Sequence, residues 1–107
     1  MSATFDRICE LAATGDLLIT EHAFDRLAKR GILAVDIKMS VTSGIVIEDY
    51  PNFYAGPNVL VLQVDRDGYP LHAVWGLKTG TDRPGYLVTA YRPNPAEWTD
   101  NFRRRIS

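Results

Sequence analysis

The 107-residue sequence has a single cysteine and no long hydrophobic run. One cysteine, Cys9, cannot form an internal disulfide. The longest purely aliphatic stretch, Val59 to Leu62, is far shorter than the roughly 20 apolar residues that a membrane-spanning helix needs. The N-terminal region also lacks the apolar run of a signal peptide, because Asp6 and Glu10 lie where that run would be. We therefore expect a cytoplasmic protein that does not span a membrane.

The common signatures of cofactor, metal and nucleophile sites are missing as well. The sequence has no glycine-rich phosphate-binding loop and no Gly-x-Ser-x-Gly elbow. Its two histidines and one cysteine do not have the close spacing of a zinc site. We therefore expect no cofactor and no metal ion, and we interpret Cys9 as a small buried hydrophobic residue.

Excess positive charge is also absent, since the net charge is −1. This argues mildly against nucleic-acid binding, because neutralised phosphates supply most non-specific affinity. The two halves differ, however: residues 1–53 carry 8 acidic and 5 basic side chains, and residues 54–107 carry 5 acidic and 7 basic ones. A local basic cleft is compatible with these numbers, although they do not require one.

The spacing of apolar residues predicts helices in the first half of the chain. The first helix is expected to end at Gly15, and the second to run from a Thr20 cap to a Gly31 stop. A short third helix should end near Gly44. The residues at helical spacing in the first and third helices are Phe5, Ile8, Leu11, Ala12, Ile37 and Val41.

The second half has the β-branched, short-period pattern of strands, with Arg66-Asp67-Gly68 as a hairpin signal. The last three strands should form an antiparallel meander, followed by a short turn or helix carrying Trp98. The predicted fold is α+β, a single domain over 1–107 with two to three N-terminal helices packed on a four-stranded, mainly antiparallel sheet. The expected strands are 45–50, 59–65, 69–78 and 86–92.

The strongest functional pattern is a polar stripe on the second helix. His22, Arg26 and Arg30 are four residues apart, so on a helix they cover an arc of about 80°. An imidazole moves protons near neutral pH, and guanidiniums bind phosphate with paired donors, so the stripe suits phosphodiester chemistry. An ordinary polar helix face explains the same residues equally well. The opposite side is expected to hold Ala23, Phe24, Leu27 and Ala28.

A second candidate set lies on the last strand. Strict alternation would put Leu87, Thr89 and Tyr91 on one face, opposite Tyr86, Val88, Ala90 and Arg92. Two hydroxyl groups in succession can orient a phosphate, but threonine and tyrosine are also common strand residues, and the structural interpretation is favoured from these residues alone. His72 is likewise interpreted as a hydrogen-bonded structural residue.

The motifs Thr20-x-His22-Ala23-x-x-Arg26-x-x-x-Arg30-Gly31-Ile32 and Thr89-Ala90-Tyr91-Arg92-Pro93 resemble those of a bacterial family of unknown function, DUF4258. The resemblance covers about residues 18–105. That family is similar to the barnase, colicin and RelE group of metal-independent ribonuclease toxins. The resemblance implies a RelE-like or barnase-like fold, with His22, Arg26, Arg30, Thr89 and Tyr91 in the site.

Two hypotheses follow. In the first, the chain is a small toxin-like endoribonuclease that needs no metal. His22 is then a general acid or base, Arg26 and Arg30 stabilise the phosphate, and Thr89 and Tyr91 orient the substrate. Arg83 and Arg92 are predicted to bind RNA, and an antitoxin or other protein partner is expected by analogy. In the second, the same fold is a non-catalytic module that binds a protein or a nucleic acid.

Overall fold

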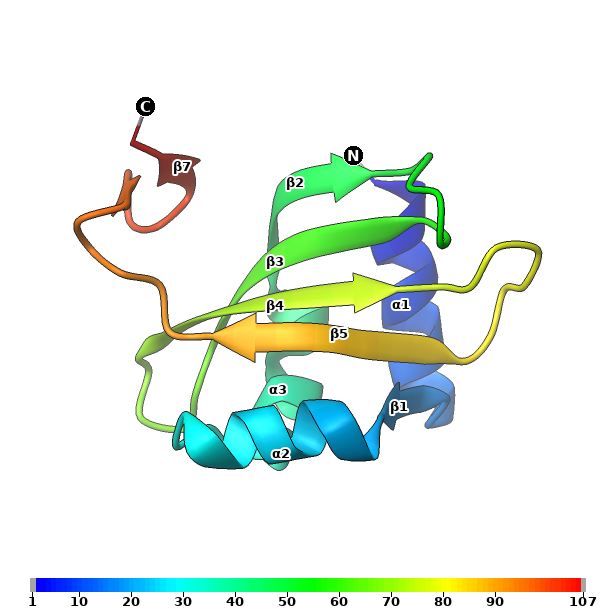
Figure 1. The fold of residues 1–107 in the computed structure, drawn as a ribbon, viewed down its shortest axis with the longest axis horizontal. Helices are drawn as coiled ribbons and strands as arrows, with labels where there is room; N and C mark the ends of the chain where they lie inside the picture. Colours follow the sequence, from blue (N-terminus) through cyan, green and yellow to red (C-terminus); the bar gives the residue numbers. More distant parts are fainter. Residues whose placement is uncertain (1, 107) are drawn as a thin grey trace.

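A computed structural model describes residues 2–106 and shows a three-helix, mainly antiparallel α+β domain (Figure 1). The predicted fold class is therefore confirmed. The elements in chain order are α1 (Ala3–Thr14), β1 (Leu17–Ile19), α2 (Glu21–Lys29), α3 (Ala34–Ser40), the 3₁₀ turn η1 (Val41–Ser43), β2 (Ile45–Tyr50), β3 (Asn58–Val64), β4 (Pro70–Gly76), β5 (Gly85–Tyr91), β6 (Trp98–Thr99) and β7 (Arg104–Arg105).

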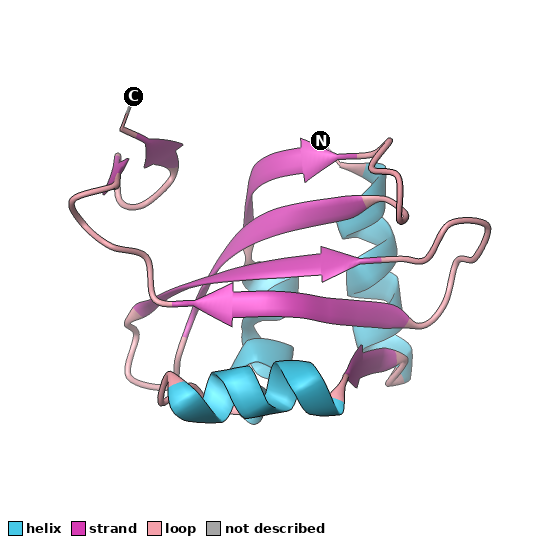
Figure 2. Ribbon diagram, viewed as in Figure 1, coloured by secondary structure: helices cyan, strands magenta, loops and turns pink. Residues whose placement is uncertain are grey.

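The main sheet has five strands in the order β1-β5-β4-β3-β2, one more than expected (Figure 2). Strands β3 to β5 form the predicted antiparallel meander, and β2 pairs antiparallel with β3 as well. The additional strand is β1, which pairs parallel with β5 and places Leu17 opposite Gly85. Because β1 lies directly before α2, this pairing fixes the start of α2 beside β5.

The helices occupy two different positions around the sheet (Figure 1). Helices α1 and α3 cover one face and enclose a core that includes Ile8, Ile37 and Trp75. Helix α2 lies instead along the edge next to β5, and we call the face opposite α1 and α3 the helix-free face. No helix within residues 2–106 is long and apolar enough to cross a membrane.

Local sequence signals set the helix ends. The side chains of Ser2 and Thr20 accept hydrogen bonds from the backbone N–H groups of Phe5 and Ala23, so both serine and threonine act as N-caps. Helix α1 ends at Gly15, which has a left-handed φ of 78°. The buried face of helix α2 is narrower than expected. Ala23 and Leu27 are buried, whereas Phe24 and Ala28 are exposed.

Strand β5 departs from strict alternation. Trp75 pairs with Leu87 and Val74 pairs with Thr89, so Val88 is an extra residue, a β-bulge. Leu87 and Ala90 both belong to the core, while Thr89 and Tyr91 lie on the helix-free face. The expectation that Leu87 shares a face with Thr89 and Tyr91 is therefore wrong, because the bulge reverses the alternation between them.

The C-terminal segment forms a small hairpin, where a short turn or helix was expected. Its strands β6 and β7 pair antiparallel, with Trp98 opposite Arg105. The connection contains three successive residues with positive φ, Asp100, Asn101 and Phe102. The hairpin packs against the helix-free face, where the Trp98 ring contacts the His72 ring with 4.4 Å between centroids.

Candidate functional site

Helix α2 brings its polar stripe to strand β5 at Arg30. The Arg30 Nη1 donates to the hydroxyl of Thr89 at 3.1 Å and to the carbonyl of Ala90 at 2.7 Å. Figure 1 shows α2 and β5 running side by side along the same edge. The predicted helix stripe therefore meets one of the two predicted strand hydroxyls, that of Thr89, at this pair.

The arginines of the stripe are not neutralised by carboxylates. Within residues 2–106, no carboxylate lies within ion-pairing distance of Arg26 or Arg30, whereas Arg66 and Arg105 each pair with one. A guanidinium has five N–H donors, and the Arg30 contacts with the strand are made by Nη1 alone. The Nε and Nη2 donors of Arg30 are therefore left to bind an anion beside β5.

His22 lies at the start of α2, one helical turn before Arg26. Its side chain is exposed, and it makes no hydrogen bond to another side chain or to the backbone within residues 2–106. In this turn of the helix the buried residue is Ala23, and the His22 imidazole is accessible to a ligand. Geometry thus leaves His22 available for proton transfer, although no hydrogen bond joins it to Tyr91.

Tyr91 is linked to the second histidine. His72 is fully buried, and its Nε2 lies 2.8 Å from the Phe102 carbonyl, which can only accept a hydrogen bond. The Nε2 therefore carries the proton, and Nδ1 accepts from the Tyr91 hydroxyl at 3.4 Å. Burial lowers the pKa of His72 and raises the pKa of Tyr91, which favours both neutral forms. His72 is a hydrogen-bonded structural residue in this arrangement, as expected.

An ion pair holds the hairpin over this cluster. Arg105 donates from Nε to the Glu48 carboxylate at 2.8 Å and from Nη2 at 3.0 Å. The same guanidinium lies 4.8 Å from the centroid of the Trp98 ring. The hydrogen bonds from Arg105 lower the pKa of Glu48. Glu48 and Arg105 are 57 positions apart and neither belongs to a local motif, so the sequence alone does not predict this cluster.

The two arginines predicted to bind RNA lie at opposite ends of β5. Arg83 precedes the strand, and its Nε is 4.0 Å from Asp82. Arg92 follows the strand and donates to the nearly buried carboxylate of Asp65 at 3.0 Å. The seven residues of β5 separate them, so Arg83 and Arg92 do not form one cluster.

A family model covers most of the chain. Residues 19–92 match the model of the family described as Domain of unknown function (DUF4258), more than half of the chain. The chain therefore belongs to the DUF4258 family. The match contains α2, the main sheet from β2 to β5 and all five residues of the candidate site, but it ends before the C-terminal hairpin. No curated protein and no solved structure matches the chain.

The residues present also bear on metal binding. Within residues 2–106 there is no group of three or more histidine, cysteine, aspartate or glutamate side chains arranged to hold a metal ion. The site does offer one exposed imidazole, two hydroxyl groups and two guanidiniums that have no carboxylate partner within the described residues. These groups can move a proton and stabilise negative charge on a phosphate.

Proposed function

We propose that this chain is a small cytoplasmic, toxin-like endoribonuclease that cleaves RNA with its own side chains alone. The observation that carries the proposal is the contact between Arg30 and Thr89. It directs to the edge of β5 a guanidinium that has no carboxylate partner within residues 2–106. Arg26 lies one helical turn before Arg30, and His22 lies one turn before Arg26. Acid/base and anion-binding groups are thereby aligned beside two strand hydroxyls.

In the proposed reaction the ribose 2′-hydroxyl attacks the adjacent phosphorus. A base removes the 2′ proton, the bond from phosphorus to O5′ breaks, and an acid gives a proton to the departing O5′. His22 performs one of these two proton transfers. Arg26 and Arg30 stabilise the negative charge that develops on the phosphate oxygens, while Thr89 and Tyr91 orient the substrate. The Thr89 hydroxyl can donate to the phosphate, whereas the Tyr91 oxygen, whose proton is directed to His72, can accept from a ribose hydroxyl. The products are a 2′,3′-cyclic phosphate and a 5′-hydroxyl.

The 2′-hydroxyl requirement gives a direct test. The purified protein is incubated in excess chelator with a DNA oligomer that contains a single ribonucleotide, and with an all-deoxy oligomer as the control. The proposal predicts cleavage only on the 3′ side of the ribonucleotide, with a cyclic phosphate end detected by mass spectrometry. Cleavage of the all-deoxy oligomer, or no cleavage of any ribose-containing substrate, contradicts it.

A second candidate function is a non-catalytic module that binds a protein partner. It is favoured by a mostly apolar hollow of about 440 Å³ beside α2, lined by Leu18, Phe24, Val35 and neighbouring residues. The side chains of these three residues are about half exposed, at 44%, 55% and 48%. Exposed apolar patches of this kind are typical of protein interfaces. An antitoxin seated here would contact the same helix that carries His22.

A further inference from the structure

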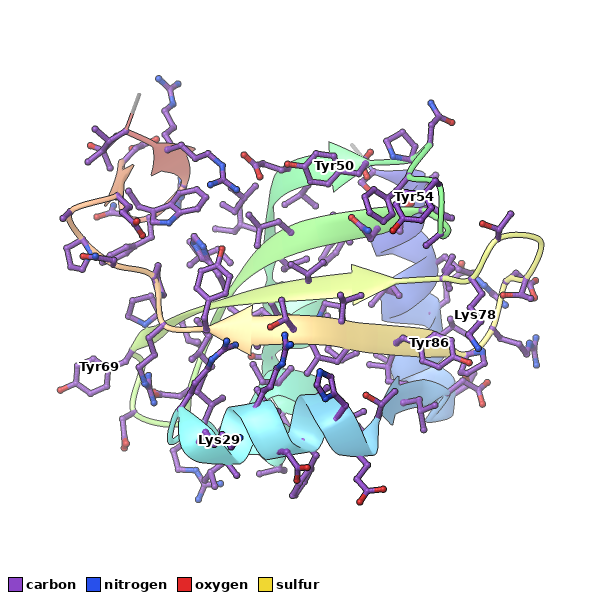
Figure 3. The ribbon with its side chains drawn as sticks, viewed as in Figure 1. Lys29, Tyr50, Tyr54, Tyr69, Lys78 and Tyr86 are labelled. Carbon is purple, nitrogen blue, oxygen red and sulfur yellow. The ribbon has the colours of Figure 1, made fainter. Side chains whose placement is uncertain are left out.

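A second hollow lies at the other end of the helix-free face, where the β2–β3 loop meets the end of β4 and the beginning of β5. Its volume is about 270 Å³, close to the lower limit for small-ligand pockets. Figure 3 shows the labelled side chains of Lys78 and Tyr86 beside each other at this end of the sheet. The side chains that matter below are Phe53, Asn58, Lys78, Tyr86 and Val88, with Gly76 between them.

Gly76 creates the space in this hollow. A Cβ atom at Gly76 would lie 3.3 Å from the Asn58 Cβ and 3.4 Å from the Val88 Cγ2, tighter than most side-chain contacts. The φ angle of Gly76 is not in the left-handed region, so a side chain at this position is restricted by its neighbours and not by backbone conformation. Any larger residue would begin to fill the hollow.

The lining combines the groups that recognise a nucleobase. Phe53 and Tyr86 are aromatic, and bases stack on aromatic rings in single-stranded RNA complexes. The Lys78 Nζ lies 5.2 Å from the centroid of the Tyr86 ring and has no carboxylate partner within residues 2–106, so it can neutralise a phosphate. The half-buried side chain of Asn58 makes no hydrogen bond within the same residues and offers both donors and an acceptor to a base edge.

The β-bulge connects this hollow to the candidate site. Val88 lines the hollow, and the next residue, Thr89, accepts the hydrogen bond from Arg30. In an unbroken strand these neighbours would lie on opposite faces, but the bulge leaves both on the helix-free face, with Cα atoms about 3.8 Å apart. A base in the hollow would therefore place its own nucleotide's phosphate next to Thr89 and Arg30.

We propose that the hollow formed by Phe53, Gly76 and Tyr86 binds one nucleobase of a single-stranded RNA, next to the phosphate held by Arg30 and Thr89. This inference rests on the proposed function for the identity of the ligand, but it does not require cleavage. Tyr86 provides the stacking surface, Asn58 contacts the base edge, and Lys78 neutralises the backbone on the outer side.

The test measures binding without cleavage. Adenosine 5′-monophosphate and ribose 5-phosphate are titrated separately into the isotopically labelled protein, and amide NMR shifts are followed. Adenosine 5′-monophosphate should shift the amides of Gly76, Leu77 and Tyr86 and should bind more tightly than ribose 5-phosphate. Ribose 5-phosphate should not shift these amides. Tyr86→Leu, which keeps apolar volume but removes the ring, should weaken binding of the nucleotide about 5- to 150-fold.

Two further variants complete the test. Gly76→Val should abolish the nucleotide-induced shifts by filling the hollow, and Tyr69→Leu, which changes an exposed tyrosine at the opposite end of the sheet (Figure 3), should bind like wild type. Equal affinity for both probes, or unchanged binding by Tyr86→Leu, would overturn the base subsite even if RNA is cleaved. Base-dependent binding by a protein that cleaves no RNA would support the subsite and reject the proposed function.

Discussion

Arg30 and Thr89 are joined by a 3.1 Å hydrogen bond, although 59 positions separate them in the sequence. The bond links the C-terminal cap of α2 to the strand segment that follows the β5 bulge. It orients the guanidinium from the strand side and leaves the Nε and Nη2 donors available. The site thus depends on a tertiary contact that fixes the position of an otherwise exposed arginine.

Replacing Thr89 by valine tests the importance of this contact. Thr89→Val keeps the shape and strand preference of the side chain but removes the acceptor, while the Ala90 carbonyl still holds Arg30. We expect the free energy of unfolding to fall by about 1 kcal/mol, the ordinary net worth of a hydrogen bond, and kcat/KM for RNA cleavage to fall more than tenfold. Urea unfolding and cleavage assays measure both. The control is Thr99→Val, an exposed strand threonine; equal activity of the two variants would remove the Thr89 hydroxyl from the mechanism.

The salt dependence of RNA affinity tests whether Arg26 contacts the RNA backbone. Each neutralised phosphate of a single strand contributes about −0.7 to the slope of log K against log salt concentration. Arg26→Gln should therefore weaken binding and make the slope shallower by about that amount. The matched control is Lys38→Gln, which removes an exposed charge from α3, on the other face of the sheet. Filter binding across a salt series measures the slopes, and identical slopes for wild type and Arg26→Gln would contradict the assignment.

The stability of the protein should fall below about pH 6.5, the ordinary pKa of histidine. Burial lowers the pKa of His72 in the folded state, although the Phe102 carbonyl and Glu48 raise it in part, while Arg105 lowers it further. The unfolded chain then binds more protons than the folded chain as the pH falls, so the free energy of unfolding decreases. Urea unfolding at pH 7.5 and pH 5.5 measures the difference. His72→Gln, which can still donate to Phe102, should reduce it; an unchanged difference in the variant would assign the pH dependence to other groups.

The C-terminal hairpin should depend on Trp98. This side chain is only 6% exposed, and it contacts both the His72 ring and the Arg105 guanidinium. Trp98→Ala should lower the free energy of unfolding by about 3 kcal/mol, the lower end for loss of a buried aromatic ring. Amide hydrogen exchange at residues 98–105 should increase more than exchange in β3. Uniform exchange across the chain, with no loss of stability, would show that the ring does not anchor the hairpin.

Much of the fold follows from local sequence patterns. The Thr20 cap, the Gly15 stop and the Arg66-Asp67-Gly68 turn each act through neighbouring residues, so their positions could be predicted. Strand β1 could not, because three apolar residues become a strand only by pairing with β5, more than 60 positions later. The C-terminal hairpin was missed for a related reason, since its position depends on contacts of Trp98 and Arg105 with the sheet.

The candidate site shows the same division. The helical spacing of His22, Arg26 and Arg30 places them on one side of α2, and the sequence predicts this directly. The face of Thr89 relative to Leu87 was predicted wrongly, because a bulge is defined by cross-strand register and not by the sequence of one strand. The ion pair of Arg92 with Asp65 likewise becomes visible only when the β3–β4 turn and the end of β5 meet in space.

The measurement that most directly tests the central claim is the cleavage rate of RNA by His22→Ala in excess chelator. His22 is exposed and makes no hydrogen bond within residues 2–106, so the variant should match wild type in circular dichroism and urea unfolding. Asp25→Ala, an exposed change on the same helix, is the control. We expect wild type to produce 2′,3′-cyclic phosphate ends, and His22→Ala to be slower by roughly two to four orders of magnitude, the usual contribution of a positioned acid or base. A folded His22→Ala protein with wild-type activity, or a wild-type protein that cleaves no RNA, would contradict the account.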